Sequence, residues 1–137
     1  MKKFATLILL ALILSPLISA FGVSNFYYGS NPLRMNPCET KEIMFLLQNM
    51  VGNQDFDARA EIITGGEIAR ISDSGKYEVL LGMKDVPVRV TVRIPEKDKP
   101  GKKYEIKLGI TATPRAASGM VSLAQGTGAI VPVEIIG

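Results

Sequence analysis

Apolar and polar residues alternate along most of the chain beyond its first twenty residues, and this alternation predicts β-strands. A period of two places successive side chains on opposite faces of a sheet, so that one face can be buried. The clearest run is residues 86–94, where Val or Ile fills every second position. Similar runs cover residues 56–63, 104–113 and 131–135. Residues 41–49 are a further predicted strand, which contains five consecutive apolar residues, Ile43–Leu47.

Turn-forming residues separate these runs and indicate the fold class. Shorter candidate strands lie at residues 21–28, 67–72, 76–81 and 120–124. Breakers between the strands include Asn36-Pro37, Gly65-Gly66, Pro100-Gly101 and Gly126–Gly128. About seven to nine short strands predict an all-β fold, namely an immunoglobulin-like two-sheet sandwich. Barrels and jelly rolls are the alternatives, because the number of strands does not fix their connections.

The first twenty residues have the order of a secretory signal. Lys2 and Lys3 precede an apolar run over residues 4–14, and small residues stand near Ala20. This order predicts a hydrophobic signal helix at residues 1–20, cleaved after Ala20, and one domain at residues 21–137. The alternative is an uncleaved anchor, since residues 4–23 carry no charge and about twenty such residues can span a bilayer.

Composition narrows the classes of function. The 137 residues include 16 Lys and Arg against 13 Asp and Glu, one Cys and no His. Without Lys2 and Lys3 the remainder is nearly neutral, which argues against a nucleic-acid partner. The absence of His excludes Ser/His/Asp and Cys/His catalytic arrangements, and a single Cys excludes an internal disulfide. We therefore predict no enzymatic activity, no cofactor and no metal.

Two short motifs carry a resemblance to a known group of domains. Pro37-Cys38-Glu39-Thr40 leads into the predicted strand 41–49, and Ile94-Pro95 is followed by Pro100-Gly101 and Tyr104. This pattern resembles bacterial and archaeal extracellular immunoglobulin-like domains, including the groups called NEW3 and CARDB. Cys38 stands where those domains usually have Gly. The resemblance implies surface presentation, adhesion or envelope assembly. From the residues themselves, we expect Tyr104 to bury its ring and to bond nearby backbone through its hydroxyl.

Outward-facing apolar residues are a candidate interaction surface. If residues 43, 45 and 47 face the core, Met44 and Leu46 face outward, which is more apolar surface than a sandwich requires. Ile130 likewise alternates with core positions, and Pro132 predicts an edge or bulged strand because it cannot donate to a ladder. These residues can form a partner-binding patch, unless loops such as residues 29–37 cover them.

A lysine-rich segment is a second candidate surface. It contains Lys97, Lys99, Lys102 and Lys103. Such a segment can touch anionic lipid headgroups or an acidic wall polymer. Interspersed acidic residues dilute its charge, and a solvated loop between strands is the simpler interpretation.

Two metal motifs are weak. Cys38 and Met35 are soft ligands suited to Cu(I), but two ligands without His make a poor site, and a buried inert thiol is the simpler interpretation. Asn53, Asp55 and Asp57 have the spacing of a calcium loop, yet its required Gly and Glu are missing. A looser calcium site that includes Glu39 stays open.

Together these patterns predict an exported, non-catalytic β-sandwich, either secreted or at the outer face of the cell membrane. Its expected role is binding of an envelope or surface protein through an edge strand or an apolar sheet face. If the leader is retained, residues 4–23 would hold the chain in the membrane. The alternative is an extracellular module that binds a soft metal or an anionic surface polymer.

Overall fold

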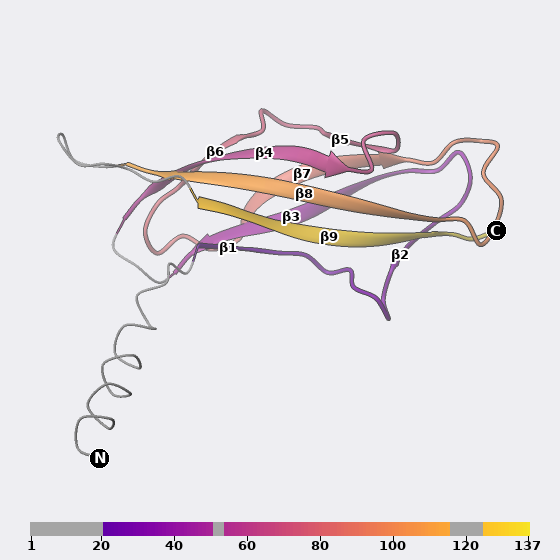
Figure 1. Cartoon of the computed structure of the whole chain (residues 1–137), viewed down its shortest axis with the longest axis horizontal. Coiled ribbons are helices and arrows are strands. Elements are labelled where there is room, and N and C mark those ends of the chain that lie inside the picture. Colours follow the sequence, from indigo (N-terminus) through magenta and orange to yellow (C-terminus); the bar gives the residue numbers. More distant parts are fainter. Residues whose placement is uncertain (1–20, 51–53, 116–124) are drawn as a thin grey trace, which may run out of the picture.

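The described part of the chain forms two β-sheets packed face to face (Figure 1). This computed structural model describes residues 21–50, 54–115 and 125–137. The predicted leader and the predicted strand at residues 120–124 lie outside these ranges. The strands are β1 (Phe21–Ser24), β2 (Leu33–Met35), β3 (Thr40–Asn49), β4 (Phe56–Thr64), β5 (Ala69–Ile71), β6 (Lys76–Val79), β7 (Val86–Arg93), β8 (Lys103–Pro114) and β9 (Gln125–Ile135).

The connections between strands are those of a sandwich. One sheet has the order β1-β3-β7-β5 and the other the order β2-β9-β8-β4-β6. Neighbouring strands are antiparallel except β2 and β9, which run parallel. The predicted all-β, two-sheet architecture is confirmed. The described residues contain no helix of the length and hydrophobicity needed to cross a bilayer.

Alternation along the strands builds the core. Val88, Val90 and Val92 of β7 are fully buried, as is Phe45 of β3, because every second residue faces the opposite sheet. The rings of Phe21 in β1 and Phe56 in β4 lie 5.3 Å apart and join the two sheets at one end. The period of two therefore determines which side chains are buried on folding. This burial is the main contribution to the stability of the fold.

The first segment of the sandwich changes sheets. β1 pairs with β3, whereas β2 pairs with β9 in the other sheet. Residues 29–37, predicted as a loop, contain β2, whose Leu33 and Met35 are buried. Three residues are too few for a period of two to be recognised, so this strand has no clear sequence signal.

β9 is longer than its sequence pattern suggests. The predicted strand at residues 131–135 extends back to Gln125, so the predicted break at Gly126–Gly128 is wrong. Gly128 pairs with Gly109 of β8, and a Cβ added at Gly128 would lie 2.8 Å from the carbonyl oxygen of Leu108. Glycine at this position thus permits a close approach of two strands rather than a turn.

Turns gather at the two ends of the long axis (Figure 1). We call the end where β1 begins the N-terminal end. It includes Asn49, which pairs with Phe21, and the connection between β6 and β7. The opposite, C-terminal end includes residues 94–102, where the Gly101 N–H donates to the Ile135 carbonyl.

Candidate functional site

Over much of its length, the outer edge of β9 has no hydrogen-bonded neighbour among the described residues, although β1 of the other sheet packs close to β9. The Ile135 N–H donates to Lys102 beside β8, whereas the Ile136 N–H donates to Met35 of β2. Because successive residues in a strand point their backbone groups to opposite sides, the even-numbered residues of β9 face away from β8. β2 pairs only with Val133–Ile135. Among the described residues, none donates to or accepts from the outward backbone groups of residues 126, 128 and 130.

Exposed aromatic residues lie on the connection between β1 and β2. Phe26 is 63% exposed and Tyr28 is 60% exposed. The same connection contributes Gly29 and Pro32 to a shallow depression that Pro132 of β9 also lines. The β1–β2 connection therefore borders β9 at residues 132–134 and carries exposed aromatic side chains, which are enriched at protein-binding surfaces.

The structure separates the predicted apolar patch. Met44 is 39% exposed on the outer face of the β1-β3-β7-β5 sheet, next to Leu46, which is half-buried. Beside Met44, Arg89 donates to Glu42 over 2.9 Å, so this face is not continuously apolar. Ile130 is 49% exposed on the other sheet, where it pairs with Lys107. The two groups thus lie on different sheets.

The lysine-rich segment lies at the C-terminal end, around a buried carboxylate. Asp98 accepts hydrogen bonds from the Tyr104 hydroxyl and from Lys102, whose Nζ lies 3.1 Å away. The Tyr104 hydrogen bond is the first cause that lowers the pKa of Asp98, and Lys102 adds to it. The predicted bond from Tyr104 to backbone is therefore replaced by one to a side chain.

The remaining lysines of this segment face solvent. Lys97, Lys99 and Lys103 are exposed, and no ion pair joins them to another described residue. The segment lies at the end of the sandwich opposite Phe21. Contact of these lysines with lipid headgroups stays a prediction.

Cys38 and Met35 lie in different environments. The Cys38 thiol is exposed, so the prediction of a buried thiol is wrong, whereas Met35 is fully buried in the core. The φ angle of Cys38 is 66°, a left-handed conformation that favours Gly. This conformation explains physically why a Gly is expected in the turn. Within the described ranges, no three His, Cys, Asp or Glu side chains could hold a metal.

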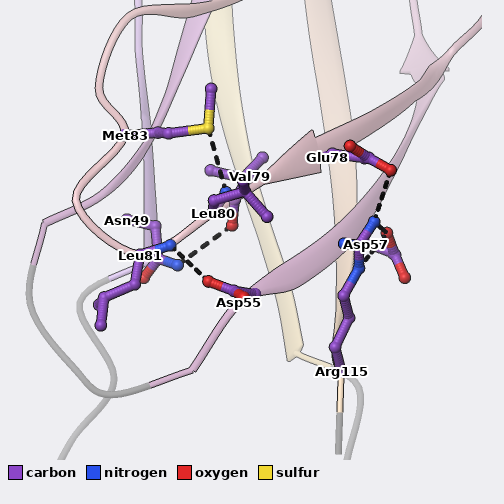
Figure 2. Close-up of polar contacts among 9 residues, drawn as sticks. All are labelled: Asn49, Asp55, Asp57, Glu78, Val79, Leu80, Leu81, Met83 and Arg115. Atoms are coloured by element: carbon purple, nitrogen blue, oxygen red, sulfur yellow. Dashed lines mark hydrogen bonds and ion pairs between the residues drawn. The ribbon is translucent and has the colours of Figure 1, made fainter.

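The acidic residues of the calcium motif have other partners (Figure 2). Asp55 accepts from the Leu81 N–H over 2.7 Å. Asp57 accepts from Arg115, whose Nη2 lies 2.6 Å from Oδ1 and 2.8 Å from Glu78. The hydrogen bond from Arg115 lowers the pKa of Asp57. Asn53 lies outside the described residues, and Glu39 lies at the opposite end of the sandwich, next to the start of β3.

A group of exposed apolar residues at the N-terminal end has no counterpart in the sequence predictions. We call Met50, Leu80, Leu81 and Met83 the apolar tip; they are 51%, 38%, 46% and 39% exposed. Residues 80–83 form a turn in which Met83 N–H donates to Leu80 and Gly82 has a φ of 86°. Positive φ at the third position is typical of a type II turn. The predicted strand at residues 76–81 ends at Val79, so its last two residues belong to this turn instead. Large apolar residues are unusual in turns, and the sequence therefore did not indicate one here.

Asn49 holds this turn against β3 (Figure 2). Its buried side chain donates to the carbonyl groups of Gln54 and Val79, at 2.7 and 3.1 Å. Its backbone donates to Met83 and accepts from Gly82, both at 2.8 Å. Its Oδ1 atom forms no hydrogen bond within the described part of the chain. The Asn49 backbone therefore bonds the turn itself, and the Asn49 side chain ties β3 to the residues that flank the turn and β4.

Comparisons with known proteins identify the fold. No protein-family model matches the chain, and no curated protein matches it. PapD-like domain 7 of human CEP192, an ASH domain, superposes with a TM-score of 0.61 at 14% identity, over 86% of each chain. The fold is an immunoglobulin-like β-sandwich, similar to that of this domain. Native α2-macroglobulin from Escherichia coli, from domain MG7 to the C-terminus, gives a TM-score of 0.51 at 11% identity. That match covers 84% of this chain but 16% of the macroglobulin chain.

At sequence identities this low, the TM-scores show a shared fold alone. The resemblance to the NEW3 and CARDB groups stays a prediction, whereas the immunoglobulin-like sandwich that it implied is confirmed.

Proposed function

We propose that this protein is an exported, non-catalytic β-sandwich that binds a protein partner at the cell envelope by strand pairing. The partner contributes an extended segment that adds to the open edge of β9. Main-chain hydrogen bonds supply the affinity in this mode, and side chains beside the edge supply the selectivity.

The observation that carries this proposal is the unpaired outer edge of residues 126–130. Folded proteins usually cover a long strand edge or protect it with charges, because an open edge recruits other strands. Here the outward positions are Gly126, Gly128 and Ile130, none of which is charged. Two glycines and one isoleucine leave room for an incoming backbone, while Phe26 and Tyr28 supply exposed apolar contacts on the β1–β2 connection.

The test removes one backbone N–H on the outer edge of β9 and keeps the hydrogen bonds between β9 and β8. Ile130→Pro deletes an N–H that faces the open edge, and Pro132 shows that this edge accommodates proline. Ile130→Ser is the matched control, because it shortens the same side chain and keeps the N–H. We expect capture of the partner from the membrane fraction to fall at least about tenfold for Ile130→Pro and much less for Ile130→Ser. Equal capture by both variants and the parent would contradict edge pairing.

Export is tested by the mass of the captured chain. A mass that corresponds to residues 21–137 would indicate cleavage after Ala20, and the full-length mass would indicate a retained anchor. The charge pattern of residues 1–20 supports export in both cases. Recovery of the chain in the cytosol, without any partner, would contradict the proposed location and role.

A further inference from the structure

We propose that the apolar tip contacts the lipid bilayer and seats the N-terminal end of the sandwich in the membrane interface. This inference rests on the proposed export, but it does not depend on the edge of β9. The occupant is lipid, and the contact is apolar rather than electrostatic.

The position of the tip is the first argument. Phe21, the residue at which residues 1–20 join the domain, pairs with Asn49. Asn49 in turn bonds directly to Gly82 and Met83 of the tip. Two strand spacings, about 10 Å, thus separate the tip from the junction with the leader. Residues 21–23 belong to β1, which leaves residues 4–20 as the uncharged part of the leader. If the leader is retained in the bilayer, the tip lies close to the membrane surface.

The hydrogen bonding of the turn is the second argument. All four backbone N–H groups of residues 80–83 donate inside the protein. Leu80 donates to the Met83 sulfur, Leu81 to Asp55, Gly82 to Asn49 and Met83 to Leu80. A solvated loop can leave such donors to water, whereas a segment that enters a lipid environment cannot, because each unpaired polar group costs free energy there.

The shape and charge of the tip favour lipid over a second protein. Four partly exposed side chains on a turn present far less than the ~800 Å² per partner that a stable protein interface buries. A few apolar side chains are enough for insertion at the level of the headgroups. Lys84 and Asp85 follow the tip in sequence and offset each other, and the lysine-rich segment is at the other end. We therefore expect binding to neutral lipid without a requirement for anionic lipid.

The single cysteine makes a direct test simple. Both labelled proteins are made in a Cys38→Ser background. Leu81→Cys carries an environment-sensitive fluorophore at the tip. Ile63→Cys carries the same fluorophore near the last residue of β4. Ile63 is the matched control because it is also exposed and apolar, at 56%. The full chain is reconstituted in phosphatidylcholine vesicles, with or without lipids that bear a nitroxide near the headgroup. We expect nitroxide quenching at position 81 to be at least about threefold that at position 63.

A second variant tests the apolar character. Leu80→Glu should lower the quenching at position 81 towards the value at position 63, whereas Ile63→Glu should leave it unchanged. Urea midpoints of both variants report whether the fold is kept.

Three results would overturn the proposal. Equal, weak quenching at both positions would show that the tip stays in water. If the fluorophore at position 81 is shielded from iodide but is not quenched by lipid nitroxide, then protein, such as a second copy of the chain, covers the tip. Quenching only with anionic lipid would show electrostatic adsorption. The Ile130 variants report on the edge of β9 separately, so failure of either proposal is recognised by itself.

Discussion

Asn49 offers a sharp test of how the tip is held. It is fully buried, and its Nδ2 atom donates to two carbonyl groups, those of Gln54 and Val79. Asn49→Ala removes both donors and leaves two acceptors without partners, each at a cost of about 1 kcal/mol or more. The same substitution removes Oδ1, which has no hydrogen bond within the described residues, and this relieves part of the cost. We expect a net loss of about 2 kcal/mol in the free energy of unfolding.

Asn49→Asp keeps the shape but replaces the donating amide by a carboxylate. Burial and the carbonyl oxygens of Gln54 and Val79 disfavour the charged form, so the pKa of the introduced acid rises in the folded state. A raised folded pKa means that the unfolded state loses its proton first as the pH increases. The stability difference from the parent should therefore be smallest below pH ~4 and should grow by up to ~1.4 kcal/mol per pH unit above it.

Urea unfolding of the parent and both variants at pH 4, 5.5 and 7 measures these differences. The parent is needed at each pH because its own carboxylates also titrate. A difference between Asn49→Asp and the parent that does not change with pH would refute the reasoning, since it would mean that the site is open to water.

Three further predictions concern other parts of the fold. Gly65 has a φ of 88°, and a Cβ there would lie 2.7 Å from the Glu105 oxygen, so Gly65→Ala should lower the urea-derived stability by about 2 kcal/mol or more. Gly66→Ala, with no atom within 4 Å of its Cβ, should change it by less than about 0.5 kcal/mol. Cys38→Gly should stabilise by about 1 kcal/mol in the same assay, because the left-handed backbone no longer strains a side chain; a loss of stability would contradict this. The lowered pKa of Asp98 favours folding above pH ~4, and this contribution disappears as the pH falls through the folded pKa; in acid titrations Asp98→Asn should flatten that part of the stability profile.

The fold was largely predictable because burial on one face of each strand imposes a period of two. Val86–Arg93 follows this rule over its whole length. Thr40–Asn49 contains five consecutive apolar residues, but its buried side chains still fall on every second position from Ile43. The structure confirms both strands. Leu33–Met35 escaped recognition because it is three residues long and owes its strand conformation to β9. The prediction of a break at Gly126–Gly128 was wrong because glycine marks a turn more often than a close approach between strands. Only the position of β8 distinguishes the two cases.

The candidate sites were less predictable, because they depend on which segments meet. Alternation correctly placed Met44 and Ile130 outside the core, yet it could not show that they lie on different sheets. The open edge of β9 exists because β2 is short, which is a tertiary property. In the apolar tip, Met50 lies beside residues 80–83 because the backbone of the preceding Asn49 bonds to Gly82 and Met83. The spacing of residues in the sequence does not predict this contact.

The tip and the open edge are compatible with simultaneous use. β9 runs from the N-terminal end, where the tip lies, towards the C-terminal end (Figure 1). β2 covers only Val133–Ile135, so the part of the edge that is free for pairing is the half nearer the tip. With the tip on a bilayer, an added strand would start close to the membrane and run away from it along β9. A partner that is itself held in the membrane meets this requirement more readily than a freely diffusing one, because a shared surface raises the effective concentration of its extended segment at the edge.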